Sequence, residues 1–297
     1  MLRMILSATL VLIFSVAFGQ LKKFYSLNDE VAFDTVAFSL HATSGNCFVK
    51  ATPDLAESPL VIYGNPDLEK INPSFKFQIQ KNTCRAQLDL QEFRSSSFGD
   101  GLVFAMLRSS EEENNYWKIH FDDKKIYKLD LNYGVGNADI DLSNASIKSF
   151  KLKSGTADIN VDYDRNKPNK IEMDTFKVQV DMGTFTSSHL ELARAKHIIA
   201  NIGFGRALLD LDEVTNQRCN VKASVGAGNL DIIIPDKNVP IIIYLKESPL
   251  CGVKIAPGFE QVEKNVYVNM AYSSKARDLL TFNIDVALGS VSFYYKD

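Results

Sequence analysis

Apolar and polar residues alternate along most of this chain, and seven times a glycine followed by a polar residue breaks the alternation. Around Gly136 the apolar positions are odd-numbered up to Val135 and even-numbered from Ala138 onward. A period of two predicts a half-buried strand on each side. The shift predicts a tight corner that keeps the apolar face on one side, because glycine adopts φ > 0 at little cost. The corner glycines are Gly45, Gly136, Gly155, Gly183, Gly205, Gly228 and Gly289.

The pair Gly134-Val-Gly136 also resembles the start of a dinucleotide-binding loop. That loop needs a helix after the glycines, a third glycine against which the helix packs, and an acidic residue about 20 positions further on. A strand pattern follows Gly136, and the third glycine is missing. The same corner also recurs at places that no single cofactor could join. These glycines therefore turn the chain and do not indicate a nucleotide site.

The spacing of the corners indicates stacked repeats. From Gly136 to Gly228 the corner glycines lie 19, 28, 22 and 23 residues apart. About 20 residues is one coil of a β-solenoid, in which each coil covers the apolar face of the next. We therefore predict an all-β fold, a single-stranded β-helix-like solenoid of glycine-cornered repeats. A β-sandwich of hairpins would show the same alternation and the same turns, and it remains the alternative.

Two stretches carry a family resemblance. The runs LDLNYGVGNADIDLSNASIKSFKLKSGTADINVDY at 129–163 and VKASVGAGNLDIIIP at 221–235 resemble bacterial adhesin-like and toast-rack β-helical domains, which repeat rungs of the form G-x-G-x-x-[ILV]-[DN]-[ILV]. The resemblance covers residues 126–235, returns around Gly289, and is looser around Gly45. It implies a β-helical protein outside the cytoplasm. It supplies no catalytic residues.

Residues 1–19 have the layout of a secretory signal peptide. Arg3 precedes an apolar run from Met4 to about Phe18, and Ala17-Phe18-Gly19 has the small residues of a cleavage site. The run is short for a membrane span, which needs about 20 residues. We expect residues 20–126 to form an N-terminal β section with the first repeat and irregular loops, and residues 127–297 to continue it as the solenoid. The mature chain would be secreted, periplasmic or at the cell surface, without a membrane span.

Charge and cysteine content narrow the class of protein. The net charge is −3 and no basic run occurs, which excludes nucleic acid as an expected partner because binding it needs a concentrated positive surface. Four cysteines lie in the exported part, and we predict at least one disulfide among them. Three pairings are possible, and the sequence does not choose between them. The candidates are Cys47, Cys84, Cys219 and Cys251.

The candidate chemistry is mainly acidic. Asp and Asn residues occupy the polar positions of the alternation after two neighbouring corners. If successive coils stack about 4.8 Å apart, Asp139 would lie next to Asp158. The two like charges would repel each other, and a bound calcium ion could relieve this repulsion. The alternative is a polar face that is exposed to solvent and binds no ion. No other cofactor is expected. The calcium candidates are Asp139, Asp141, Asp158 and Asn160.

Other reactive side chains are scattered. Some secreted β-helices cleave acidic polysaccharides with clustered aspartates and a basic residue; Arg194 and Arg206 are available, but neither has a fixed spacing to the acids. No serine lies in a G-x-S-x-G elbow. We expect the histidines to be ordinary surface or half-buried residues, and Trp117 and most tyrosines to pack in the core or at its rim. The histidines are His41, His120, His189 and His197.

We therefore expect an exported, non-enzymatic, adhesin-like β-helical protein with a binding or surface-structural role. Its partner would be a glycan, another cell-envelope component or a protein. One alternative is a secreted polysaccharide lyase or hydrolase on the same scaffold, and another is an accessory domain in the cell-envelope stress response.

Overall fold

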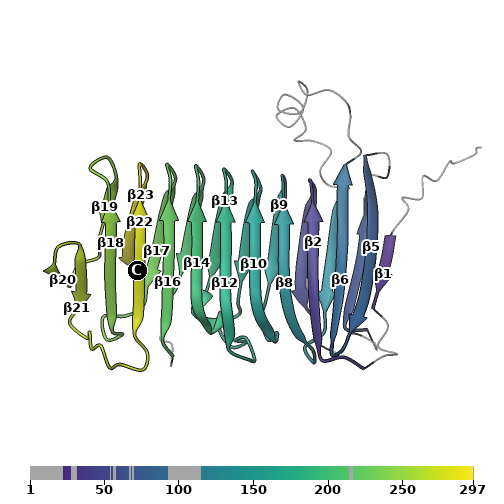
Figure 1. The fold of residues 1–297 in the computed structure, drawn as a ribbon, viewed down its shortest axis with the longest axis horizontal. Coiled ribbons are helices and arrows are strands. Elements are labelled where there is room, and N and C mark those ends of the chain that lie inside the picture. Colours follow the sequence, from purple (N-terminus) through teal and green to yellow (C-terminus); the bar gives the residue numbers. More distant parts are fainter. Residues whose placement is uncertain are drawn as a thin grey trace, which may run out of the picture.

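The computed structural model describes residues 23–27, 32–53, 55, 58–66, 68, 70–92, 115–213 and 217–296. Its strands form an 11-stranded and a 12-stranded sheet, which run side by side along the long axis of the molecule (Figure 1). The elements are β1 (Lys23–Ser26), β2 (Thr35–Ala42), β3 (Asn46–Ala51), β4 (Leu60–Asn65), β5 (Ile71–Gln80), β6 (Thr83–Glu92), β7 (Tyr116–Phe121), β8 (Ile126–Tyr133), β9 (Asn137–Asp141), β10 (Ile147–Ser154), β11 (Asp158–Asp162), β12 (Met173–Val180), β13 (Thr184–Ser188), the 3₁₀ helix η2 (Leu190–Ala193), β14 (Ala195–Ile202), β15 (Arg206–Asp210), β16 (Cys219–Val225), β17 (Asn229–Ile234), β18 (Ile241–Glu247), β19 (Gly252–Lys254), β20 (Phe259–Glu263), β21 (Val266–Asn269), β22 (Leu280–Val286) and β23 (Ser290–Tyr295).

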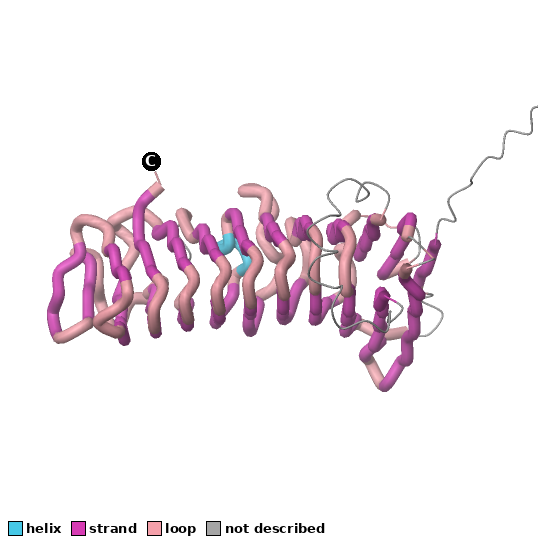
Figure 2. The backbone as a smooth tube through the Cα atoms, turned by 90° about the horizontal axis from the view of Figure 1, so that it is seen from above, coloured by secondary structure: helices cyan, strands magenta, loops and turns pink. Residues whose placement is uncertain are grey.

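Each repeat forms one rung of a solenoid. Its first strand lies in the 12-stranded sheet, and its second strand lies in the 11-stranded sheet. Successive rungs pair in parallel, as β8 does with β10 and β9 with β11. Hairpins would pair antiparallel, so the predicted solenoid is confirmed and the hairpin sandwich was the wrong alternative. Viewed from above, the rungs follow one another as similar turns, with η2 midway along the stack (Figure 2).

The core is the space between the two sheets. Apolar side chains of equivalent positions stack from rung to rung, and the rings of Phe150 and Phe176, which are register partners, lie 4.7 Å apart. The column continues through Ile198, Val221 and Phe282, all of them buried. Burial of apolar area contributes about 25 cal/mol per Å². No rung can gain this alone, so the rungs stabilise one another.

The spatial order of the rungs differs from their order in the chain. β6 and β7 lie outside β2 and β3, so the N-terminal section supplies rungs of the same stack. At the other end, β22 and β23 are inserted between the rung β16–β17 and the rung β18–β19. The C mark in Figure 1 accordingly lies inside the row of strands.

Antiparallel strands close three of the four sheet ends, and at the fourth the 11-stranded sheet ends on β19, which pairs in parallel with β23. β4 and β1 add to β7 on one sheet, and β5 adds to β6 on the other. At the far end β21 and β20 add to β18. An open end of a parallel stack would present unpaired backbone groups to other chains, and these reversals replace it with short antiparallel edges.

The corners are three residues long and stack directly on one another. Backbone hydrogen bonds continue through them, for example from Phe204 N to Asp181 O at 2.8 Å and from Ala227 N to Gly203 O at 2.8 Å. A Cβ atom at Gly228 would lie 2.2 Å from the carbonyl oxygen of Gly205, and a Cβ atom at Gly289 would lie 1.9 Å from that of Gly228. The corners therefore need glycine chiefly because the next backbone is too close.

Two details of the predicted corners were wrong. Among the corner glycines only Gly45 and Gly136 have φ in the left-handed region, at 111° and 114°. Gly155 aligns with Gly134, and Ala157 occupies the position equivalent to Gly136, since Asp158 pairs with Asn137. The sequence pattern alone did not show whether a glycine occupies the first or the last position of the three-residue corner.

The middle residue of each three-residue corner points outward. Val135, Met182, Phe204 and Leu288 continue the apolar phase of the sequence, and we expected them to face the core. They are exposed by 41%, 58%, 74% and 59%. The three-residue corner turns its middle residue away from the core, so this part of the expected apolar face was wrong.

The predicted disulfide is not formed, because none of the four cysteines is bonded to another cysteine. Cys84 pairs with Val36 at the start of β2, whereas Cys47 lies just after the corner that ends that rung. Cys219 begins β16, whereas Cys251 directly precedes β19 at the corner edge. A strand rises about 3.3 Å per residue, so the two cysteines of each pair, Cys47 with Cys84 and Cys219 with Cys251, are more than about 10 Å apart along the strands. This distance is beyond the reach of a disulfide.

A buried asparagine holds the edge opposite the corners. Oδ1 of Asn169 accepts a hydrogen bond from Ile147 N at 2.8 Å, and Nδ2 donates to the carbonyl oxygens of Ile147, Ile171 and Ala193 at 2.8, 2.8 and 3.2 Å. One fully buried side chain thus joins the backbone of three successive rungs. Asn269 has the same role beneath β18, through Ile241 N and Val239 O.

We predict that Gly228→Ala lowers the free energy of unfolding by about 1–3 kcal/mol, because the added Cβ overlaps the backbone of the neighbouring corner. Gly252→Ala is the matched control: its Cβ would meet only Ser290 Cβ at 3.5 Å, so stability should stay within about 0.5 kcal/mol. Urea unfolding measures both variants. Equal stability of the two would contradict the steric account of the corners.

We predict that Asn169→Ala costs about 2–3 kcal/mol, since it leaves the buried N–H of Ile147 and several carbonyl groups without their partner. Asn166 lies three residues earlier on the exposed side of the same loop, and Asn166→Ala should change stability by less than about 0.5 kcal/mol. Thermal unfolding of the two variants makes the comparison. A similar melting temperature would show that Asn169 does not hold the rungs together.

Candidate functional site

An aromatic face lies on the outer side of the 11-stranded sheet near its N-terminal end. Strands β1, β4, β7 and β3 are neighbours there, and their registers place Phe24 beside Tyr63, Tyr63 beside Lys118, and Lys118 beside Phe48. Phe24, Tyr63 and Phe48 are exposed by 65%, 36% and 39%. We define the aromatic face as Phe24, Phe48, Tyr63, Tyr116, Lys118 and His120.

The parallel and antiparallel pairings of these four strands fix the spacing of the rings. Neighbouring strands lie about 4.8 Å apart, so Tyr63 and Phe48, which flank Lys118, are about 10 Å apart across the sheet. A regular sheet holds such side chains in a plane. The face is therefore a flat row of rings, a shape that suits an extended ligand.

His120 supports the ring of Tyr63. The two rings stack with centroids 5.3 Å apart and an angle of 2°, and the Tyr63 hydroxyl lies 3.1 Å from His120 Nε2. Thr52 Oγ1 is 2.8 Å from the other ring nitrogen. Burial lowers the pKa of His120, and the nearby Lys118 and Lys50 lower it further. At neutral pH the imidazole is therefore uncharged and fixes the orientation of Tyr63.

Lys118 gives this face a positive charge between its rings. Its ammonium lies 5.9 Å from the centroid of Phe48 and 5.4 Å from that of Tyr116. Attraction to both ring faces holds the lysine over the sheet. The face can therefore combine ring contacts with a charged hydrogen bond to an anionic or hydroxyl-rich ligand.

The polar residues predicted to bind calcium continue this face, but the structure does not bring them together as expected. Asp139 pairs with Phe48 on one side and with Asn160 on the other, whereas Asp158 pairs with Asn137 and accepts a hydrogen bond from Thr184 N. The predicted contact between Asp139 and Asp158 was therefore wrong, because the corner of that rung is shifted by two residues.

Asp141, the fourth candidate, already has partners. Lys50 lies 3.1 Å away, and Ser143 N donates to its carboxylate at 3.0 Å. Burial would raise the pKa of Asp141, but the hydrogen bonds from Ser143 and the charge of Lys50 outweigh it and lower the pKa. Asn160 donates to Asp162 at 2.6 Å.

The basic residues considered for catalysis have other partners. Arg194 donates to the carbonyl groups of Asn169 and Lys170, and Arg206 lies 3.7 Å from Asp231. Among the described residues, the side chains of His189, Asp210 and Asp212 lie close enough together to hold a metal ion. His189 was expected to be an ordinary surface or half-buried residue, although it lies 21 and 23 positions before the two aspartates, close to one rung period.

The aromatic face was also missed in the sequence. Trp117, Tyr127, Tyr133 and Tyr163 are buried, as expected for strand packing. Phe24 and Tyr63 belong to the irregular N-terminal section, where no repeat shows which strands become neighbours. The alternation in Leu60–Asn65 could have indicated that Tyr63 is exposed, because it places Tyr63 on the other side of the strand from the buried Leu60 and Ile62.

Two expectations concern membranes and export. In the part of the chain that the structure describes, no helix is long and apolar enough to cross a membrane. The predicted signal peptide at 1–19 lies outside the described residues.

Part of the chain matches a known family. Residues 67–184 match the family described as the N-terminal domain of toast_rack, DUF2154. A solved "putative cell adhesion protein" from Clostridium sporogenes ATCC 15579 is 16% identical with a TM-score of 0.43, over 93% of this chain and 99% of that one. A solved "putative adhesin" from Bacteroides fragilis NCTC 9343 is 12% identical with a TM-score of 0.36, over 92% and 96%. A comparison with curated proteins finds no match.

The glycine-cornered rungs and the parallel stacking of the strands make this chain a β-solenoid, and within it residues 67–184 are similar to the N-terminal domain of toast_rack.

Proposed function

We propose that this protein is an exported, non-enzymatic, adhesin-like binding protein whose aromatic face holds an extended glycan. The observation that carries the proposal is the row of exposed rings Phe24, Tyr63 and Phe48, in register across neighbouring strands of a rigid sheet. Sugar rings present flat C–H surfaces that stack on aromatic side chains, and a flat row can contact several rings of one polymer.

The charged residues of the face favour a glycan that carries acidic groups. Lys118 lies within the row of rings, and Lys50 lies on the neighbouring strand beside His120. The same row continues into Asp139 and Asn160, which offer acceptors and a donor for hydroxyl groups. A polymer lying across the sheet would thus meet rings first and polar side chains next.

Two further observations support a role outside the cytoplasm. The layout of residues 1–19 is that of a cleaved leader, and the resemblance of the repeats to toast-rack β-helical domains implies a protein outside the cytoplasm. Antiparallel strands close three of the four sheet ends, so display along the sheets is a better use of this scaffold than growth at its ends.

Binding without cleavage is the preferred proposal over a polysaccharide lyase or hydrolase. The aromatic face contains Lys118 and His120, but the acids that continue its row, Asp139 and Asp141, are spread over separate partners. Hydrolysis of a glycosidic bond by the common route needs two carboxyl groups that flank one bond. The aromatic face supplies ring contacts in place of that pair.

We predict that residues 20–297 bind an acidic polysaccharide on a glycan array, and that Tyr63→Ala and Phe48→Ala each weaken the binding by up to about tenfold, because one stacking contact contributes about 0.5–1.5 kcal/mol. Tyr244 is the matched control, since it is an exposed tyrosine, at 42%, on the opposite sheet. Tyr244→Ala should leave the affinity unchanged.

The same polysaccharides are incubated with the protein and their chain length is followed. Constant chain length agrees with binding alone, whereas shortened or unsaturated products would replace the proposal with the enzyme alternative. Equal loss of affinity in Tyr63→Ala and Tyr244→Ala would show that the aromatic face is not the binding surface.

A further inference from the structure

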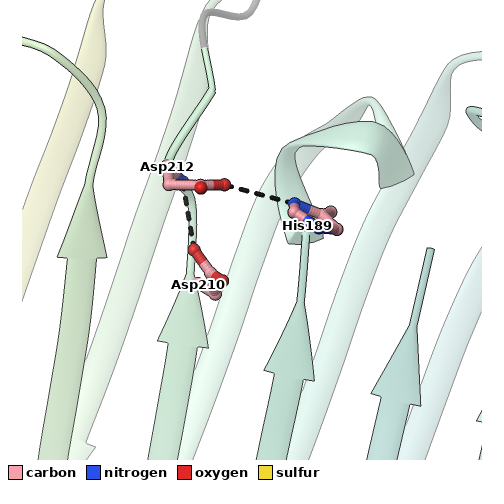
Figure 3. Close-up of side chains that lie close together, drawn as sticks. All are labelled: His189, Asp210 and Asp212. Atoms are coloured by element: carbon pink, nitrogen blue, oxygen red, sulfur yellow. Dashed lines mark hydrogen bonds and ion pairs between the residues drawn. The ribbon is translucent and has the colours of Figure 1, made fainter. Parts of the chain in front are cut away.

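A second group of functional side chains lies on the edge of the stack opposite the corners. The strands of the 11-stranded sheet run away from the corners, and β13 and β15 are neighbours there. His189 directly follows β13, Asp210 ends β15, and Asp212 lies two residues further on. Figure 3 shows the three side chains converging from these two strand ends.

The distances within this group are short. His189 Nδ1 lies 3.2 Å from an Asp212 carboxylate oxygen, and one donor atom from each of the three residues lies within 4.8 Å of the others. Donors around a tetrahedral zinc ion with bonds of about 2.1 Å are about 3.4 Å apart. A rotation of the side chains that moves each donor by about an ångström would therefore complete a coordination sphere.

The group is buried and includes a third acid whose carboxylate has no hydrogen-bond partner. The side chains of Asp210 and Asp212 are each 8% exposed, and that of Glu191 is 1% exposed. Glu191 Oε1 lies 3.8 Å from His189 Nδ1, and neither carboxylate oxygen of Glu191 has a hydrogen-bond partner. Burial raises the pKa of Glu191 to about 8, and the neighbouring Asp212, Asp210 and Glu213 add to it. A buried acid aimed at such a group is costly unless something binds it.

Two cations now balance the charge of the aspartates from outside. Lys296 Nζ lies 3.1 Å from Asp210 Oδ2 and 2.8 Å from Asp212 Oδ2. Arg165 reaches Asp212 at 3.5 Å and Glu213 at 3.6 Å, and its Nε donates to His189 Nε2 at 3.3 Å. Both side chains are about half exposed, at 43% and 57%. The ammonium of Lys296 bridges two carboxylates, as a metal ion would.

We propose that His189, Asp210, Asp212 and Glu191 form a binding site for one divalent transition-metal ion, in which the ion replaces the ammonium of Lys296. This site is separate from the aromatic face and does not depend on the proposed glycan binding. One imidazole nitrogen with carboxylate oxygens suits zinc or manganese, whereas calcium takes oxygen ligands. The ion would join two adjacent rungs and supply the missing partner of Glu191.

Proton transfer accompanies binding in this arrangement. Because Arg165 donates to Nε2, the ring hydrogen of His189 lies on Nδ1, which faces Asp212. Nδ1 can coordinate a metal only when the ring hydrogen lies on Nε2 instead, and Arg165 then loses its acceptor. Glu191 must also lose its proton to act as a ligand. Metal binding therefore releases protons.

The test is isothermal titration of metal-free protein, residues 20–297, with zinc chloride, manganese chloride and calcium chloride. We expect zinc or manganese to bind with a stoichiometry of one per chain, to release protons in buffers of different ionisation enthalpy, and to raise the melting temperature. Calcium should bind at least tenfold more weakly.

Variants separate a metal site from a network of ion pairs. His189→Asn keeps a residue that tolerates the left-handed φ of 53° at this position, and it should weaken zinc binding by at least tenfold, as should Asp212→Asn. His197→Ala, which removes an exposed histidine outside the group, should have no effect. Lys296→Gln removes the competing ammonium and should tighten zinc binding several-fold.

Absence of saturable zinc and manganese binding to the wild-type protein would overturn the proposal. Equal binding by wild type and His189→Asn would overturn it as well, because the ion would then lie elsewhere. Weaker binding in Lys296→Gln would show that the lysine supports the group instead of occupying the place of an ion, and would also count against the site.

Discussion

The close stacking of the corners is the constraint on which the rest of this structure depends. Backbone hydrogen bonds run through the three-residue corners from one rung to the next. In five corners a Cβ atom on the last residue would lie 1.9–2.2 Å from a carbonyl oxygen of the neighbouring corner; these residues are Gly136, Gly183, Gly205, Gly228 and Gly289. This contact leaves one register for two neighbouring rungs, because a shift by a single residue would place a side chain against backbone and turn the apolar face outward. The core of stacked rings, such as Phe150 on Phe176, follows from that register. The polar edge follows from it too, where Asn169 joins three rungs at fixed height.

Fixed register also creates function on this scaffold. Residues that are about 22 positions apart in the chain become neighbours about 4.8 Å apart, so a site needs only one suitable residue per rung. His189 and Asp212 meet in this way, 23 positions apart on adjacent rungs. The aromatic face uses the same geometry at the closed end of the stack, where antiparallel strands bring Phe24 and Tyr63 to the row that Phe48 begins. The two surfaces differ in chemistry: one is open, flat and ring-bearing, and the other is buried and acidic.

The sequence predicted the strands, the corners and the solenoid, because alternation and glycine positions are local signals. The rung β18–β19 was missed, since Ser248–Cys251 joins its strands without a corner glycine. The order of the rungs was missed as well, because nothing local shows that β22–β23 enters between rungs formed earlier in the chain. An error of two residues at Gly155 was enough to pair Asp139 with Asp158 in place of Asn160. Sites on a solenoid depend on register across rungs, so a small local error moves every predicted neighbour.

The insertion of the last rung links the fold to the buried acidic group. β23 lies beside β17, which lies beside β15, and Lys296 directly follows β23. Its ammonium can reach Asp210 and Asp212 only when β23 is in place between β17 and β19. Before that step three acids, Asp210, Asp212 and Glu191, would be close together with Arg165 as their nearby cation. Their repulsion would oppose closure of the edge, so an ion or Lys296 must neutralise it. The last rung of the chain thus supplies a cation to an acidic group that earlier rungs form.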